Sequence, residues 1–513
     1  MYDSKKIPNF GSQRLSIKSV YSNITIQMKS LPQWVPICLI IVNCLLYEWW
    51  GVFELAALQP FAAFCKIVIP LYLLIIVFPT NFHFPPLKKF IYIFAIFMVW
   101  GAVSTITSNF FIEGIFQWAK FFFRFLFCIA VCLYFIERPI SHQQTIMKIL
   151  VSIAVVTVVQ YFILEVISLT QLGAENGVKL KTDSGGFYYG PFGLLGNGTA
   201  QFSYFYKIPK FQLQGFWVEP SIASGFLFMA AFIAEALFVS TQKRMWVTAS
   251  GICCLGGIFA FANAGYFALG FALLTGQIVC FIRGNRGRTL RVVLSRGIGY
   301  KFLMATSIFL ILFSLFGRYV VINYIPHNEP LKAITGVRGA LLTLIPSPSP
   351  SPIKPIKPIS VDDTMMQRGK LVKDCFDRSF FKVLVGDGFR IPGRDSEGRG
   401  VVVSASAPIM WLFFTGIIGL IILLLRESQV FLGFASAFPP SAYQLRIFQA
   451  WIVLFFQNMV YGTWMTPLYF LLLALVFSSL SIQKEKVLHI LMEEKTKKFP
   501  DSNYCSLSSN RVN

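Results

Sequence analysis

The feature that most constrains this chain is a series of long apolar runs separated by mostly short polar connections. Most runs have roughly the 17–25 residues that a helix needs to cross the hydrocarbon region of a bilayer. Only 13% of the residues are charged, which is too little for a surface that faces water. The sequence therefore predicts an all-α polytopic membrane bundle of about twelve transmembrane helices, near 34–48, 56–79, 90–108, 115–136, 147–168, 217–240, 245–262, 264–282, 299–317, 406–425, 444–461 and 464–482.

Basic residues predict which connections face the cytoplasm. Residues 1–33 form a basic tail, and no cleavable signal peptide precedes the first run. If this tail is cytoplasmic, every second connection should be cytoplasmic as well, and those connections carry Lys88, Lys89, Arg138, Lys243, Arg244, Arg283, Arg286, Arg288, Arg291, Arg296, Arg426 and Arg446. Residues 484–513 then form a second cytoplasmic basic tail. The net charge of +22 thus reflects membrane orientation, and nucleic acid is the weaker interpretation.

Two connections on the opposite side are long. Within the transmembrane domain at 34–483 they cover about 169–216 and 318–405, and loops of this length are commonly functional or disordered. The second contains Ser-Pro and Lys-Pro repeats, typical of an extended spacer, followed by helical periodicity over about 364–384. Its apolar face, which includes Phe376 and Phe380, is expected to pack against the membrane domain. The functional residues are therefore expected to lie on the outer side of the membrane.

The heptapeptide Gly-Phe-Trp-Val-Glu-Pro-Ser at 215–221 leads into the sixth apolar run. Pro220 suits the first turn of a helix, and Glu219 before it would lie near the positive end of the helix dipole. A simple helix start with a favourable acid explains these residues equally well, so the heptapeptide alone does not establish a site.

Arg368 falls on the apolar face predicted within the second long loop. A cation on a face that packs against a membrane domain needs an anionic partner. Arginine pairs through two parallel hydrogen bonds with either a carboxylate or a phosphate. A structural ion pair is the commoner case, and a phosphate ligand is the functional alternative.

Lys120 and Arg124 are four residues apart in the fourth run, and a helix places them on one face. Charges inside a membrane span are costly and often mark a ligand pathway. Lys120 could extend its amine to the membrane surface, whereas Arg124 lies deeper. The pair is a candidate cradle for a lipid diphosphate. No nucleotide-binding, zinc-binding or nucleophile-elbow motif is found, so no metal or other cofactor is expected.

Taken together, three stretches resemble the O-antigen polymerase / O-antigen ligase family of bacterial polysaccharide assembly membrane proteins. Residues 215–221 are similar to the family motif G-F-x-E-P-S/N. Arg368, followed by Val-Gly-Asp-Gly-Phe at 385–389, is similar to the R…G-x-G stretch of its large outer loop. The run after Pro408 carries Gly-Ile-Ile-Gly-Leu at 416–420, like the family's G-I-x-G-L helix. The layout of twelve helices with two long outer loops agrees.

This resemblance implies a polymerase that joins polyprenyl-diphosphate-linked oligosaccharide repeats at the outer face of the bacterial cytoplasmic membrane. The diphosphate leaves, so neither nucleotide nor metal is required. Cations should stabilise its developing charge, and the cations implied are Arg368, Arg124 and Lys120. Glu219 would orient or deprotonate the acceptor hydroxyl. Further substrate contacts are expected at Lys210, Trp217 and Asp387, and the expected protein partners are a chain-length regulator and a flippase.

Departures from the family pattern separate the alternatives. Ligases of this family usually carry a His just before the closing helix, where this chain has Ser-Ala-Ser-Ala at 404–407; this difference favours a polymerase over an O-antigen ligase. A polysaccharide-lipid flippase or another secondary transporter would also need many helices and internal cations. A polyprenyl-phosphate-sugar glycosyltransferase and a non-catalytic scaffold are further alternatives.

Overall fold

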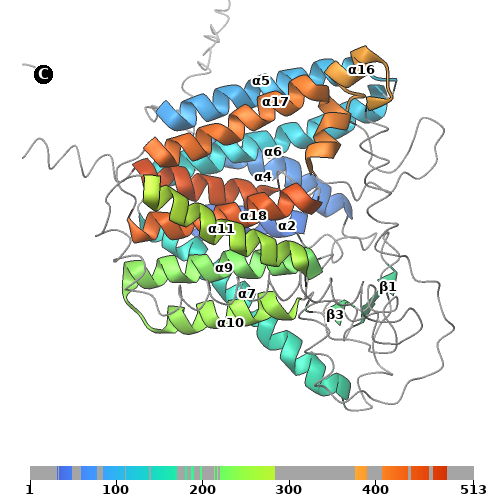
Figure 1. The fold of residues 1–513 in the computed structure, drawn as a ribbon. Helices are drawn as coiled ribbons and strands as arrows, with labels where there is room; N and C mark the ends of the chain where they lie inside the picture. Colours follow the sequence, from blue (N-terminus) through green and yellow to red (C-terminus); the bar gives the residue numbers. More distant parts are fainter. Residues whose placement is uncertain are drawn as a thin grey trace, which may run out of the picture.

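The computed structural model describes the helical part of the chain (Figure 1). The residues described are 32, 34–48, 59–77, 85–109, 111–137, 140–169, 180–181, 187–189, 197–198, 213, 217, 220–260, 262–282, 376–389, 407–436, 441–461 and 466–481. Within them the structure is helical except for turns and three very short strands, which confirms the predicted all-α class. Both predicted basic tails and the run near 299–317 lie outside the described residues.

Twelve helices lie in the described residues. They are α2 (Trp34–Glu48), α4 (Gln59–Val77), α5 (Pro85–Ile106), α6 (Phe111–Glu137), α7 (Ile140–Leu169), α9 (Pro220–Thr241), α10 (Met245–Phe259), α11 (Asn263–Ile282), α16 (Phe380–Val385), α17 (Ala407–Ser436), α18 (Ala442–Tyr461) and a last helix at Pro467–Ser481. Strands β1 (Leu180–Lys181), β2 (Phe187–Tyr189) and β3 (Asn197–Gly198) pair antiparallel in that order. Three helices begin at proline, whose fixed backbone angle and missing N–H suit the first helical position.

Five helices of the described part are long and apolar enough to cross a membrane. They include Pro85–Ile106, Phe111–Ile136, Ile140–Phe162, Ser221–Thr241 and Pro408–Phe434, and five shorter apolar helices accompany them. This is a polytopic helical membrane protein. Eleven of the twelve predicted runs coincide with a helix of the described residues. The total number of spans, and the side of the membrane that each connection faces, stay predictions.

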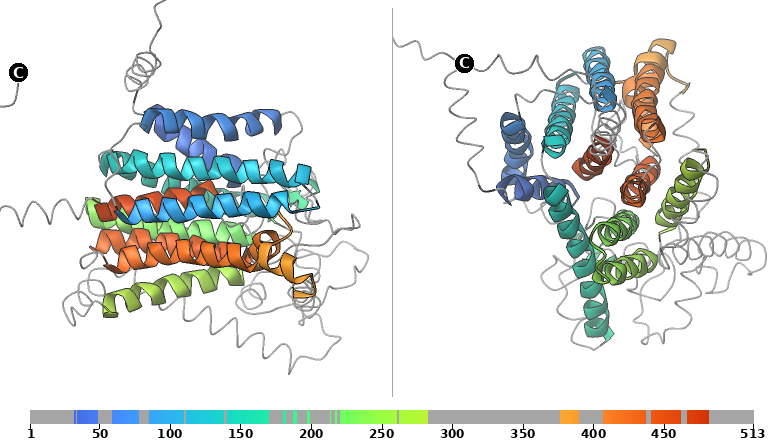
Figure 2. Two further views of the ribbon diagram at one scale, coloured as in Figure 1. Left: turned by 90° about the horizontal axis from the view of Figure 1, so that it is seen from above. Right: turned by 90° about the vertical axis from the view of Figure 1, so that its left-hand side faces the viewer.

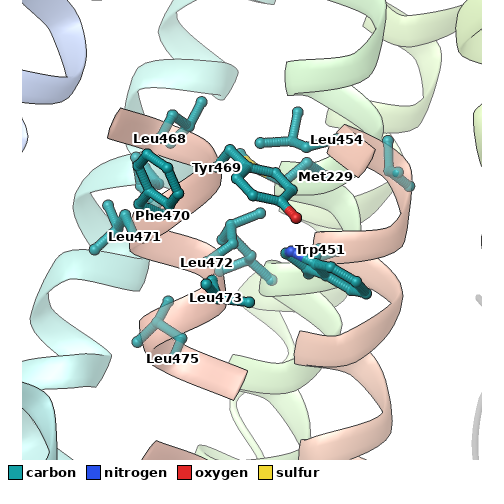
Figure 3. Close-up of a cluster of buried hydrophobic side chains, with 14 of the residues drawn as sticks. Met229, Trp451, Leu454, Leu468, Tyr469, Phe470, Leu471, Leu472, Leu473 and Leu475 are labelled. Carbon is teal, nitrogen blue, oxygen red and sulfur yellow. The ribbon is translucent and has the colours of Figure 1, made fainter. Parts of the chain in front are cut away.

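The helices run roughly along one direction (Figure 2). Helix α9 packs against α10 and α18, α11 packs against α18, α17 packs against α5, and α4 packs against α6. Helix α9 and the last helix, at Pro467–Ser481, are the most deeply buried, and the last helix lies near the middle of the end-on view in Figure 2. Figure 3 shows its Leu and Phe side chains, with the Tyr469 hydroxyl directed toward Trp451 of α18.

Helix α17 extends eleven residues beyond the predicted end of its run, and this extension corrects the placement of Arg426. The basic pattern predicts Arg426 in a cytoplasmic connection, but the structure buries it completely within α17. Its guanidinium pairs with the neighbouring Glu427 and lies 4.5 Å from the ring centroid of Phe94 on α5. Tyr469 donates a hydrogen bond to the same carboxylate. Because Glu427 neutralises the cation, the helix continues through a position that charge alone marks as a loop.

Arg446 was also wrongly assigned to that connection. It is buried in α18 and donates to Gln449 Oε1 at 2.7 Å. Gln449 in turn donates to the carbonyl of Ala272 on α11. The carboxylate of Glu235 on α9 lies within electrostatic reach of Arg446 and is hydrogen-bonded to Ser250 of α10. The buried charge therefore belongs to a polar network that joins four helices.

Candidate functional site

Helix α17 is broken at Gly416, and the second long loop docks at the break. Gly416 has φ of 64° and ψ of −172°, which lies outside the helical region and suits glycine. The segment that docks there is 376–389, which contains α16. We call this part of the bundle the α16 end; it is also where α5 ends and where α6 and α17 begin (Figure 1).

The break exposes backbone carbonyls that a continuous helix would satisfy internally, and the docked segment supplies their donors. The N–H of Asp387 donates to the Phe413 carbonyl at 2.9 Å, and the N–H of Gly388 donates to the Phe414 carbonyl at 3.0 Å. Helix α5 contributes the Ser104 hydroxyl to the Phe414 carbonyl at 2.6 Å and the Trp100 indole to the Thr415 carbonyl at 2.8 Å. Irregular backbone at membrane depth is tolerated when protein groups satisfy it in this way.

Two cations hold the side chain of Asp387. Arg378 Nη1 lies 2.9 Å from one carboxylate oxygen, and Lys382 Nζ lies 3.2 Å from the other. Arg378 also donates to the Phe413 carbonyl, and its guanidinium lies 4.4 Å from the centroid of the Phe413 ring. The Asp387 side chain is 10% exposed. The cluster therefore anchors the loop segment to α17, and the sugar contact predicted for Asp387 would have to operate alongside these ion pairs.

Phe389 inserts its ring between α5, α6 and α17 and is almost fully buried. Its backbone N–H donates to Thr105 Oγ1 on α5 at 3.4 Å. The ring centroid lies 5.0 Å from that of Phe121 on α6 and 5.7 Å from that of Trp411 on α17. Gly101 and Gly114 leave room for this residue, because a Cβ at Gly101 would lie 2.6 Å from the Phe389 ring. The loop is thus wedged into the membrane domain by one aromatic side chain.

Arg124 lies next to this wedge. Its guanidinium carbon is 4.7 Å from the centroid of the Phe121 ring, the ring that Phe389 contacts on another side. Lys120, one turn earlier on α6, is exposed. The structure therefore brings together two features that are far apart in the sequence: the paired cations of α6, and the 385–389 stretch of the second long loop.

A third cation joins the pair. Lys66 on α4 is half-buried and lies within electrostatic reach of both Arg124 and Lys120. Helices α4 and α6 pack against each other; Lys66 and Lys120 lie in the first halves of their helices, and Arg124 lies at the middle of α6. We call Lys66, Lys120 and Arg124 the cation cluster. Lys66 was not predicted because no second Lys or Arg stands three or four positions from it in the sequence, although a Lys inside an apolar run is itself a signal.

The remaining predicted residues do not join this cluster in the described part of the chain. Trp217 is fully buried and stacks on Phe226 of α9, with ring centroids 4.4 Å apart. Helix α9 packs against α7, α10, α11 and α18, whereas α6 packs against α4 and α5. Glu219, Lys210 and Arg368 lie outside the described residues.

The expectation that Phe376 and Phe380 pack against the membrane domain was wrong, because these side chains are 55% and 79% exposed. Val385 and Phe389, which lie further along the segment, make the buried contact instead. The physical reason is that docking proceeds through backbone hydrogen bonds of 386–389 at the α17 break, and only short α16 precedes them.

Comparison with known protein families, with curated proteins and with solved structures finds no match for this chain. The site is therefore interpreted from its own chemistry. Three cations, two half-buried and one exposed, lie beside a loop segment whose ion pairs and aromatic wedge fix its position. Such a cluster attracts a multiply charged anion.

Proposed function

We propose that this protein is a polymerase that joins polyprenyl-diphosphate-linked oligosaccharide repeats at the outer face of a bacterial cytoplasmic membrane, in the assembly of O-antigen, capsule or exopolysaccharide. The cation cluster is the observation that carries this proposal. Three positive charges on two packed membrane helices would attract a multiply charged anion. A diphosphate would be bound by all three, and Arg124 would contribute paired hydrogen bonds.

The surroundings of the cluster support a lipid-borne anion. Large apolar side chains of α4 and α6 are exposed around it: Phe61, Phe64, Ile67, Val68, Leu71, Phe111, Ile112, Ile115 and Phe116. On membrane helices such side chains face the lipid. Lys120 is exposed on the same pair of helices. A headgroup attached to a polyprenyl chain would therefore reach the cations laterally, with its tail remaining in the bilayer.

The proposed reaction forms one glycosidic bond for each diphosphate ester bond that it breaks. An acceptor hydroxyl attacks the anomeric carbon of the donor repeat, the bond from that carbon to the diphosphate oxygen breaks, and the diphosphate keeps the electron pair. The cation cluster would stabilise the charge that develops on the leaving group. The hydroxyl proton passes to a base, for which Glu219 is the predicted residue, and Arg368 is the predicted additional cation. Lys210 and Trp217 are proposed to contact the sugars.

Buried ionisable residues favour a second candidate, a polysaccharide-lipid flippase or another secondary transporter. Two ionisable pairs lie inside membrane helices: Glu427 with Arg426, and Glu235 near Arg446. Ionisable groups in such positions often lie on transport pathways. In the structure they are satisfied by Tyr469, Gln449 and Ser250, which equally suits a structural role.

The deciding experiment measures glycan length in a strain that lacks the protein and is complemented with single variants. Wild type should restore long chains, whereas Arg124→Gln, Lys66→Gln, Glu219→Ala and Arg368→Ala should leave single lipid-linked repeats at normal protein levels. Lys89→Gln is the matched control, because Lys89 is an exposed lysine at the start of α5. Long chains in the uncomplemented strain, with no second polymerase present, would refute the proposal. Lipid-linked repeats confined to the inner leaflet would identify a flippase instead.

A further inference from the structure

We infer that Phe389 is a positioning residue: through the Phe121 ring it sets the orientation in which Arg124 meets the phosphate. This inference rests on the proposed function, because it assumes that Arg124 binds the diphosphate. It adds a role for the second long loop, because Phe389 of that loop contacts the ring on which Arg124 lies.

Arg124 lies against the ring of Phe121. The guanidinium carbon lies 4.7 Å from the ring centroid, within the range of a cation–π interaction. Both residues belong to α6 and are three positions apart, so the helix places them side by side. The plane of the Phe121 ring therefore limits the orientations open to the guanidinium.

Two aromatic side chains hold the Phe121 ring. Phe389 packs against it with centroids 5.0 Å apart, and Trp411 of α17 packs in an edge-to-face geometry at 5.1 Å. Phe121 is partly buried. Aromatic pairs of this kind contribute direction as well as apolar contact.

Phe389 is itself held by backbone hydrogen bonds. Its N–H donates to Thr105, and the adjacent Gly388 N–H donates to the Phe414 carbonyl at the α17 break. The Arg378–Asp387 ion pair anchors the same turn. Movement of the loop segment would therefore be transmitted to Arg124 through the rings of Phe389 and Phe121.

The test uses full-length protein in lipid nanodiscs and measures the affinity for farnesyl diphosphate, with farnesol as the probe that lacks phosphate. Phe389→Leu and Phe389→Met remove the ring and keep an apolar side chain. Each should weaken farnesyl diphosphate binding about three- to tenfold and leave farnesol binding unchanged. Phe434→Leu is the matched control, since Phe434 of α17 is fully buried and stacks on Phe448 of α18.

A double-variant cycle separates positioning from a general packing effect. In an Arg124→Gln background, Phe389→Leu should cause no further loss of affinity. An equal loss in both backgrounds, or an equal loss in Phe434→Leu, would overturn the positioning role and leave the proposed function standing. Normal farnesyl diphosphate binding by Arg124→Gln, Lys66→Gln and Lys120→Gln would overturn the proposed diphosphate site and the inference with it.

Discussion

The backbones of Gly386 and Gly416 approach each other so closely that neither residue could carry a side chain. A Cβ built on Gly386 would lie 2.6 Å from the Gly416 nitrogen, and one built on Gly416 would lie 2.7 Å from the Gly386 nitrogen. Both residues have positive φ, of 91° and 64°. Two glycines 30 positions apart thus form a single backbone contact, and it joins the second long loop to α17.

This contact predicts that Gly416→Ala destabilises the protein strongly. The methyl group would meet rigid backbone, and the conformation itself disfavours alanine. We expect a lower melting temperature in detergent and faster proteolytic cleavage within the second long loop. Gly251→Ala on α10 is the control, because a Cβ there meets nothing within 4 Å; it should melt like wild type or slightly higher. Equal melting of the two variants would contradict the close backbone contact.

The ion pair between Arg378 and Asp387 should be coupled energetically. Arg378→Ala and Asp387→Ala should each loosen the loop segment, and the double variant should cost less than the sum, because either change alone leaves a largely buried charge without this partner. Proteolysis rates of the loop give the comparison. Lys382→Gln should have a smaller effect, since the Lys382 side chain is 36% exposed. Additive costs for Arg378 and Asp387 would show that the pair does not anchor the segment.

Removing one member of the buried pair in α17 should be more harmful than removing both. Arg426→Met leaves Glu427 charged in the interior with only Tyr469 as donor, a situation that costs about 3–5 kcal/mol in buried pairs. The double variant Arg426→Met/Glu427→Gln should regain much of that loss. Thermal unfolding of the three proteins in the same detergent measures this order. A double variant less stable than Arg426→Met would refute the neutralising role of the pair.

Lys66→Gln should have opposite effects on stability and on ligand binding. With one fewer cation beside Arg124 and Lys120, the protein without ligand should be more stable to heat, because like-charge repulsion is relieved. Its affinity for farnesyl diphosphate should fall about tenfold, as expected for the loss of one charge-assisted contact. Melting curves with and without the ligand measure both effects. Lys88→Gln, an exposed lysine at the start of α5, should change neither.

The sequence predicts the helical runs of this protein well because hydrocarbon thickness imposes a length on each of them. It fails at Arg426 and Arg446, whose charge assigned them to a cytoplasmic connection, although the predicted run at 444–461 itself contains Arg446. Their partners, Glu427 and Gln449, make burial tolerable, and whether such partners face the cation depends on packing between helices. The run length alone contains no such information.

The candidate site was predictable only in part, and the reason is geometric. Lys120 and Arg124 are found from helical spacing, since both lie on one element. Lys66 and Phe389 come from other elements, and their approach depends on α4 packing against α6 and on the 376–389 segment meeting the α17 break. The 376–389 segment contacts the α17 break through backbone hydrogen bonds, and the identities of the side chains do not specify the pattern of such bonds.

The broken helix also bears on which parts of this protein can be removed. The second long loop looks like an appendage that could be trimmed to obtain a smaller protein for biochemistry. Yet its Asp387 and Gly388 amides donate to carbonyls of α17. Without them the Phe413 carbonyl would lose its backbone donor and the Phe414 carbonyl would keep the Ser104 hydroxyl, and a polar group left unsatisfied in hydrocarbon costs several kcal/mol. A shortened protein must therefore keep residues 376–389 and their covalent connection to α17. This part of the loop supplies hydrogen-bond donors that the broken α17 helix does not supply itself.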